Sequence, residues 1–259
     1  MISIVVPAHN EEKRIRKMLE GYGSFFTEKK NKKEIENFEI LVVINNTKDK
    51  TEELVKEFSK KYKGIKYLNF KQGGKGFAII EGFKDALKRD NEVIGFVDAD
   101  MATPPEAFYD LIKNINNYDG IIADRWNKKS RIVPKQNLFR RFISRGYNII
   151  VRILFLMPFR DTQCGAKLFK REILEKNYKK LITINWNFDI ALLYCLRKES
   201  NARIKTIPTL WHDEKGSKVH LKRTPILMFA SLIRLRLIHS PFKFIVRAYR
   251  KLPEKLKIH

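Results

Sequence analysis

The chain has 259 residues and a formal net charge of +24, with 53 Lys and Arg against 29 Asp and Glu. This length is sufficient to bury a sizeable core within one domain. Two cysteines exclude a disulfide-stapled scaffold and indicate a reducing compartment. The first residues already read as a strand, and no uncharged apolar run approaches the roughly 20 residues of a spanning helix, so we expect neither a signal peptide nor a transmembrane helix.

The positive charge is concentrated in two segments. Residues 124–171 hold 13 Lys and Arg against 2 Asp and Glu, and residues 218–259 hold 11 against 1. The remainder of the chain is nearly neutral, so the protein is not uniformly basic. Two basic surfaces predict an anionic partner, which can be nucleic acid, anionic lipid or a phosphorylated substrate.

In the first half of the chain, strand-like apolar runs alternate with helix-like segments. Strands are expected at Ile2–Pro7, Phe38–Ile44, Ile65–Phe70, Val93–Val97 and Gly120–Ala123, with helices at about 11–22, 50–62, 75–89 and 104–116. This alternation predicts an α/β fold with a mostly parallel sheet flanked by helices. Ligands of such sheets bind beyond the carboxyl ends of the strands, so the polar residues 7–11, 45–47 and 98–100 should meet at one edge.

Asp98 and Asp100 directly follow the apolar run at 93–97. Carboxylates two residues apart at a strand end can hold a hard divalent cation, and Mg²⁺ takes one or two carboxylates plus phosphate oxygens. Such a site suits a nucleotide diphosphate, whose leaving charge requires neutralisation. A solvated pair of loop carboxylates is the alternative. The next helix is expected to have Thr103 as its cap and Pro104 as its first residue.

Gly73-Gly74-Lys75-Gly76 opens the third expected helix. Glycines before a helix expose backbone N–H groups to phosphate or ribose, and Lys75 adds a positive charge. The spacing matches neither a P-loop nor a dinucleotide fingerprint, so a simple tight turn is the alternative.

The second half of the chain carries isolated polar turns. In the turn at 160–165, Asp161 can be a salt-bridged structural carboxylate, and Cys164 is expected to be a buried small side chain rather than a nucleophile. Asp189 can cap a helix at Ile190–Lys198. Residues 211–218 follow a strand at Arg203–Pro208 and carry donors suited to a diphosphate. The cysteines and histidines lack the spacing of a zinc site.

Two further segments, 136–159 and 224–250, interleave arginines with aliphatic and aromatic residues. This composition is typical of helices that lie in a membrane interface. The alternative for either helix is packing against the core with a solvated basic face.

Together these motifs resemble glycosyltransferase family 2 with the GT-A fold, and polyprenyl-phosphate sugar synthases in particular. Residues 7–12 are similar to the family's opening P-A-x-N-E-E, and Asp98-Ala99-Asp100 is similar to its metal motif. Residues 98–103, 161–169, 186–189 and 211–218 resemble dolichyl-phosphate β-glucosyltransferases, whereas residues 140–148 look more like dolichol-phosphate mannose synthases. Two departures matter: Ile44-Asn45 replaces an acidic pair that contacts the base, and Ala102 stands where mannose synthases often have Gln.

The resemblance implies a role for each matching residue. The implied catalytic residues are Asp98, Asp100, Asp161, Asp189 and Arg125, of which Asp98 and Asp100 hold Mg²⁺ or Mn²⁺. The implied nucleotide-sugar-binding residues are Pro7, Ala8, Asn10, Glu11, Asn45, Lys75, Gly76, Asp98, Ala99, Asp100, Gln163, Trp186, Ser217 and Lys218. The implied contacts to the acceptor phosphate are Arg125, Arg140, Arg141, Ser144 and Lys218.

The implied reaction is an inverting transfer of a sugar from a nucleotide-sugar to polyprenyl or dolichyl phosphate, with UDP-glucose or UDP-N-acetylglucosamine favoured as donor. The alternatives are a GDP-mannose-dependent mannose synthase, a family 2 transferase with a hydroxyl acceptor and, from another class, a nucleic-acid-binding protein, which the carboxylates at the sheet edge disfavour. We expect a GT-A catalytic domain at 1–221, with an amphipathic insertion at about 136–159, and basic interface helices at 222–259. These helices would attach the protein peripherally to an anionic membrane surface, on the cytoplasmic face.

Overall fold

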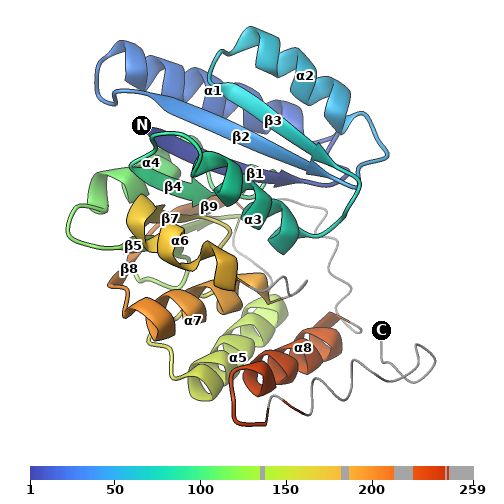
Figure 1. The fold of residues 1–259 in the computed structure, drawn as a ribbon, viewed down its shortest axis with the longest axis vertical. Helices are drawn as coiled ribbons and strands as arrows, with labels where there is room; N and C mark the ends of the chain where they lie inside the picture. The colour runs from blue at the N-terminus through green and yellow to red at the C-terminus, as the bar shows by residue number, and fades with distance from the viewer. Residues whose placement is uncertain (135–137, 182–186, 213–223, 243, 245–259) are drawn as a thin grey trace.

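The computed structural model describes residues 1–134, 138–181, 187–212, 224–242 and 244, and for residues 138–142 and 224–227 it describes the backbone alone. Its centre is a seven-stranded sheet in the order β3-β2-β1-β4-β7-β5-β8 (Figure 1). The strands are β1 (Ile2–Ala8), β2 (Phe38–Asn45), β3 (Ile65–Phe70), β4 (Val93–Phe96), β5 (Gly120–Asp124), β7 (Lys167–Lys170) and β8 (Ile204–Pro208). The predicted mostly parallel α/β sheet is therefore confirmed.

One strand breaks the parallel pattern. β1 pairs in parallel with β2 and β4, β2 with β3, and β5 with β8. β7 lies between β4 and β5 and is antiparallel to both. Because β4 and β5 are each antiparallel to β7, they run in the same direction, and their carboxyl ends reach the same edge of the sheet. The sequence did not indicate β7, since four residues are too few for a clear alternation.

The helices cover both faces of the sheet (Figure 1). They are α1 (Ile15–Asn31), α2 (Thr51–Lys61), α3 (Lys75–Ala86), α4 (Pro105–Asn114), α5 (Leu138–Phe155), α6 (Arg171–Asn177), α7 (Phe188–Ser200) and α8 (Thr224–Ile238), with a 3-10 turn η1 (Tyr178–Lys180). A second sheet pairs β6 (Arg131–Val133) with β9 (Leu210–His212). The expected helices are present, although α1 begins at Ile15 rather than at residue 11 and continues to Asn31.

Two expected helix caps are wrong. α4 begins at Pro105, its N-cap residue Pro104 is extended, and no side chain caps it. The reason is that a residue before proline is disfavoured in the helical region, so Pro104 cannot start the helix. Thr103 is buried instead, and its carbonyl oxygen accepts a hydrogen bond from the Tyr22 hydroxyl (2.8 Å). Asp189 likewise lies inside α7, whose N-cap residue is Asn187.

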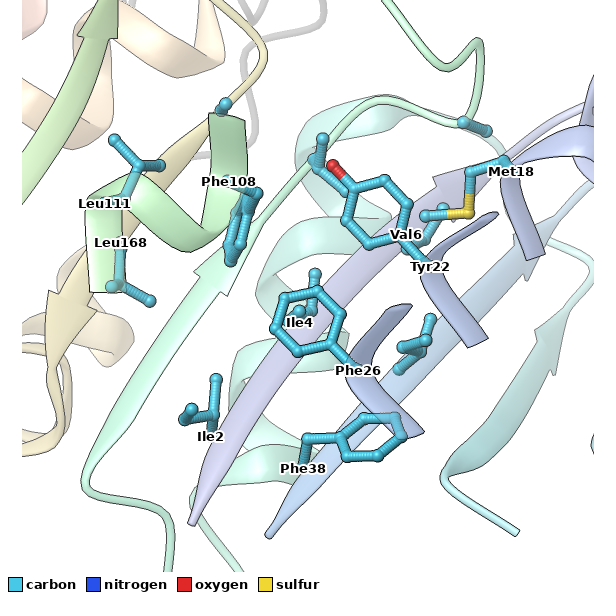
Figure 2. Close-up of a cluster of buried hydrophobic side chains, with 14 of the residues drawn as sticks. Ile2, Ile4, Val6, Met18, Tyr22, Phe26, Phe38, Phe108, Leu111 and Leu168 are labelled. Carbon is cyan, nitrogen blue, oxygen red and sulfur yellow. The ribbon is translucent and has the colours of Figure 1, made fainter. Parts of the chain in front are cut away.

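Alternation along the strands divides the core into two layers. Ile4 and Val6 of β1 pack with α1 and α4, in the cluster that Figure 2 shows around Tyr22 and Phe26. Val5, between them, faces α3 on the opposite side. Side chains on a strand alternate between its two faces, so a strand covered on both faces is buried, and nearly continuously apolar, along its length. β2 is accordingly buried along its whole length.

α5 and α8 lie side by side at the end of the molecule remote from β3 (Figure 1). Their inner residues, Val151 of α5 and Leu232 and Leu235 of α8, are fully buried in the same cluster as α7. Within the described part of the chain, no helix has both the length and the apolarity that crossing a bilayer requires.

Candidate active site

A cavity of about 410 Å³ lies where β1, β2 and β4 end. These strands are neighbours in the sheet and run in parallel, so the polar residues that follow them converge as the sequence predicts. The cavity is lined by Pro7, His9, Glu11, Arg14, Asn45, Gly74, Lys75, Asp98, Ala99 and Asp100.

The two carboxylates of the predicted metal motif lie together in this cavity. Lys75, from the first turn of α3, places its Nζ 2.6 Å from Oδ1 of Asp98. Burial raises the pKa of Asp100 above its usual value, and the negative charge of Asp98 raises it further. Burial alone would lower the pKa of Lys75, but the charges of Asp98 and Asp189 outweigh burial and raise it. The cavity therefore contains a compact set of opposite charges.

Gly165 brings the loop before β7 directly against Asp98. A Cβ built on Gly165 would lie 3.0 Å from Oδ1 of Asp98 and closer still to Oδ2. Because Lys75 approaches the same carboxylate from α3, the Asp98 side chain is held between α3 and the 161–165 loop.

The Asp98–Asp100 pair fits a divalent cation. Two carboxylates offer hard oxygen donors, and among the residues that the structure describes no third His, Cys, Asp or Glu is close enough to form a group of metal ligands with them. Mg²⁺ and Mn²⁺ are commonly held in this way, with one or two protein carboxylates and the remaining positions filled by phosphate oxygens and water. The residues present thus suit a cation that arrives with a nucleoside diphosphate.

Asn45 has a structural role that the sequence did not reveal. Its side-chain Nδ2 donates to the carbonyl oxygen of Ala8 (2.9 Å), and its Oδ1 accepts from the backbone N–H of Gly74 (3.0 Å). The side chain is buried. Asn45 therefore joins the ends of β1 and β2 to the glycine turn before α3, and fixes the shape of the cavity.

A second group of charges lies beside the cavity. Lys167 of β7 is fully buried, and its Nζ is 2.6 Å from Oδ1 of Asp189 and 2.5 Å from the carbonyl oxygen of Cys164. Lys75 approaches the other oxygen of Asp189 at 3.8 Å. Burial would raise the pKa of Asp189, but Lys167 and Lys75 outweigh it and lower that pKa. Asp189 therefore bridges two lysines and stays ionised.

Arg125 and Asp161 form a bidentate ion pair. Nε and Nη2 of Arg125 donate to the two oxygens of Asp161 at 2.7 and 2.9 Å, and the backbone N–H of Arg125 donates at 3.1 Å. Asp161 is fully buried; burial would raise its pKa, but Arg125 lowers it below the usual range. The Arg125 guanidinium also lies over the ring of Trp211, 5.2 Å from its centroid. The geometry therefore supports the interpretation of Asp161 as a salt-bridged structural carboxylate.

Hydrogen bonds connect α5 to this region. Asn148 of α5 accepts from the backbone N–H and the hydroxyl of Thr162, both at 3.1 Å, beside Asp161. The Tyr147 hydroxyl donates to Asn187 at the start of α7, and Asn187 donates to the carbonyl oxygen of Met228 in α8 at 3.0 Å. α5 is thus fixed to the loop that borders the cavity and to the start of α7, and α8 is fixed to the start of α7.

The remaining predicted residues fall into three groups. Ala8 is buried within β1, and Asn10 lies just after that strand. Gly76 packs against the Phe188 ring, and a Cβ on residue 76 would overlap with this ring. Gln163 and Ser144 are partly exposed, on the 161–165 loop and on α5. Outside the described residues are Trp186, Ser217 and Lys218, together with the side chains of Arg140 and Arg141.

Sequence reasoning missed four residues of this site: His9, Arg14, Gly74 and Lys167. His9 and Gly74 stood inside motifs that the sequence singled out, so position in the motif was an available signal. Arg14 holds Glu11 at 2.5 Å, three residues away, which is a recognisable local pair. Lys167 stood inside the 161–169 block that resembles the family, but nothing along the chain indicated its partner Asp189, which is 22 residues distant.

The chain is similar to known proteins over most of its length. The family model described as glycosyl transferase family 2 matches residues 3–178. Similar curated proteins include a dolichyl-phosphate beta-glucosyltransferase of Trichomonas vaginalis (33% identical, 92% of this chain, 73% of that protein) and one of Dictyostelium discoideum (32%, 91% and 73%). The counterpart from Saccharomyces cerevisiae is 29% identical over 92% of this chain and 75% of its own length.

Solved structures share the fold. Glucosyl-3-phosphoglycerate synthase from Mycobacterium tuberculosis, in complex with UDP, superposes with a TM-score of 0.63 at 16% identity, over 91% of this chain and 80% of that one. S. aureus TarS in complex with UDP-GlcNAc has a TM-score of 0.58 at 17% identity, over 96% and 69%. The expected GT-A type of α/β fold is therefore confirmed. The family model matches residues 3–178, and the Trichomonas vaginalis relative is similar over 92% of this chain. The chain therefore belongs to glycosyltransferase family 2.

Proposed function

We propose that this protein transfers glucose from UDP-glucose to the phosphate of a polyprenyl or dolichyl lipid, with inversion at the anomeric carbon. The observation that carries the proposal is the pair Asp98 and Asp100 beside Lys75, in a cavity at the carboxyl ends of β1, β2 and β4. The similarity to dolichyl-phosphate beta-glucosyltransferases supports glucose and a lipid phosphate. The same similarity favours glucose over mannose, which the likeness of residues 140–148 to mannose synthases had left as an alternative.

On the donor side, Asp98 and Asp100 would hold Mg²⁺ or Mn²⁺, which supplies charge neutralisation for the leaving diphosphate. Lys75 lies between Asp98 and Asp189 and is positioned to add a positive charge to the same diphosphate. The backbone N–H groups at the start of α3 offer further donors to an anion. These groups would stabilise the charge that develops as the bond between the anomeric carbon and the diphosphate breaks.

On the acceptor side, a phosphate oxygen attacks the anomeric carbon, the bond from that carbon to the β-phosphate oxygen of UDP breaks, and UDP leaves. A lipid phosphate is already anionic at neutral pH, so no side chain has to remove a proton from it. Arg140 and Arg141 are proposed contacts because arginine can hold a phosphate with two parallel hydrogen bonds, and Ser144 is proposed as a hydroxyl donor. Arg125 is proposed to contribute its positive charge, because its Nε and Nη2 already donate to Asp161. α5, which carries three of these residues, is anchored to the 161–165 loop through Asn148.

The geometry disfavours a hydroxyl acceptor, which would require a general base. Asp161 and Asp189, two of the predicted catalytic residues, are each buried and paired with basic side chains that lower their pKa values. A carboxylate held in this way is a weak base. Asp98 and Asp100 also argue against the nucleic-acid alternative, because without a metal these two carboxylates would repel nucleic-acid phosphates.

We also propose that α5 and α8 attach the protein to an anionic membrane surface, on the cytoplasmic face. Ile153 and Leu156 at the end of α5 are 68% and 86% exposed, and Phe229 and Ile233 of α8 are exposed as well. Exposed arginines at 152, 234 and 236 accompany them. An apolar stripe with basic flanks is the pattern of an interfacial helix. The free thiols of Cys164 and Cys195 fit a reducing compartment.

The test is a donor and acceptor screen with purified protein, Mg²⁺ or Mn²⁺, a polyprenyl phosphate and a panel of nucleotide-sugars. We expect transfer from UDP-glucose that requires the lipid phosphate, and a product whose glycosidic bond is β. Transfer to a lipid alcohol or glycan, with none to the lipid phosphate, would replace the proposed acceptor. Flotation with anionic liposomes tests attachment, and Ile153→Asp with Leu156→Asp should reduce it.

A further inference from the structure

This inference concerns the nucleoside end of the cavity and rests on the proposed function. If the diphosphate lies at Asp98, Asp100 and Lys75, one end of the cavity is occupied. The cavity continues from the end of β4 across β1 to β2, where Pro7, His9 and Asn45 form its wall. A nucleoside attached to that diphosphate and held within the cavity therefore lies against these three residues.

The obvious polar group at this end is already engaged. Asn45 uses its amide nitrogen on the carbonyl oxygen of Ala8 and its amide oxygen on the N–H of Gly74. A base that took either atom would break a buried hydrogen bond that holds the cavity wall together, and a buried polar group left unpaired is destabilising. Asn45 is therefore poorly suited to recognise a base.

The neighbours of His9 fix which ring nitrogen carries the proton. Its Nδ1 lies 2.8 Å from the backbone carbonyl oxygen of Asn45. A carbonyl oxygen can only accept, so Nδ1 is the protonated nitrogen, and Nε2 of the neutral ring carries the lone pair. Asn10 agrees: its Oδ1 accepts from the backbone N–H of Lys48 (2.8 Å), which turns its amide nitrogen toward Nε2 at 3.4 Å.

We propose that His9 recognises uracil, with Nε2 accepting the N3–H of the base. The contact from Asn10 to Nε2 is long and solvent-exposed, so a better-aligned donor can replace it at small cost. Uracil presents a donor at N3, whereas cytosine presents an acceptor at the same position. A site with an acceptor there binds the first base and repels the second. His9 is thus the residue that discriminates uracil from cytosine.

The experiment compares the dissociation constants of UDP and CDP, measured calorimetrically with Mg²⁺, for wild type and variants. Because UDP and CDP differ only in the base, the ratio of their dissociation constants does not depend on changes that a substitution causes at the ribose or the diphosphate. We expect wild type to prefer UDP by at least about tenfold, as a hydrogen bond of about 1.4 kcal/mol gives. His9→Phe keeps an aromatic ring but has no acceptor, and should reduce the preference to within about threefold. His9→Gln, whose amide oxygen can accept, should restore part of it.

His239→Phe is the matched control, because it makes the same change at a histidine that stacks on Tyr194 between α7 and α8. It should keep the wild-type ratio. A folded His9→Phe variant that still prefers UDP tenfold overturns the inference while leaving the proposed function intact. Equal wild-type affinity for UDP and CDP also overturns it. A wild-type protein that binds neither nucleotide contradicts the proposed function as well.

Discussion

Gly165→Ala offers a direct test of how Asp98 is positioned. A Cβ at residue 165 would lie 3.0 Å from Oδ1 of Asp98 and closer to Oδ2, a separation at which the carboxylate or the loop has to move. The backbone of Gly165 lies outside the left-handed region, so the variant adds no backbone strain and the effect is steric. Lys75 of α3 pairs with the same carboxylate, which limits how that carboxylate can move.

The expected magnitude follows from the size of a methyl group. Relief of the overlap requires a displacement of about 1 Å, and a misplacement of this size in a catalytic group can cost about 100-fold in rate. Disturbing a group that orients a metal ligand typically weakens metal binding by about 10- to 100-fold. Overpacking costs about 1–3 kcal/mol of stability, which for a chain of this size lowers Tm by several degrees without unfolding the protein at 25 °C.

The assay is a titration of Mn²⁺ by electron paramagnetic resonance with UDP present, together with turnover and thermal unfolding. Gly146→Ala is the matched control, because a Cβ at that position in α5 meets no atom within 4 Å. It should leave metal affinity and turnover at wild-type values. If Gly165→Ala bound Mn²⁺ and turned over as wild type does, Asp98 would not be held by this loop, or would not be a metal ligand.

Three other substitutions have distinct expected outcomes. Asp100→Asn should abolish transfer and weaken UDP binding only when Mg²⁺ or Mn²⁺ is present; full activity, or wild-type turnover in EDTA, would contradict the metal role. Lys75→Met removes the lysine that is paired with Asp98, so Mn²⁺ should bind more tightly in the absence of nucleotide, while turnover falls at least about tenfold. Weaker Mn²⁺ binding would refute the idea that Lys75 and the metal compete for Asp98. The pKa of Asp161 is lowered in the folded protein, so its ionisation stabilises the fold above the unfolded pKa of about 3.9, and this stabilisation is lost as pH falls further. Asp161→Asn should therefore lower Tm strongly at pH 7 and reduce the further loss of stability below about pH 4. Thermal unfolding measured across this pH range checks both results.

Local sequence was sufficient for most of the sheet and for one half of the site. The runs at β1, β2 and β4 are almost continuously apolar because the sheet is covered on both faces, and this pattern is visible without a structure. Once parallel strands are predicted, the convergence of Pro7, Asn45 and Asp98 follows from the geometry of such sheets. The paired carboxylates indicated a metal for the same local reason, since their spacing is only two residues.

The tertiary structure decided what each polar group is engaged with. Lys167 finds Asp189 only because β7 is inserted antiparallel between β4 and β5, and no short-range pattern encodes that placement. Asn45 matched a base-contacting position along the chain, but in space its amide is used by Ala8 and Gly74. A buried polar atom must find a partner, and the partner is chosen by proximity in the fold rather than by distance along the sequence. Residue type and spacing thus determine which chemistry is available, and packing determines which side chain can perform it.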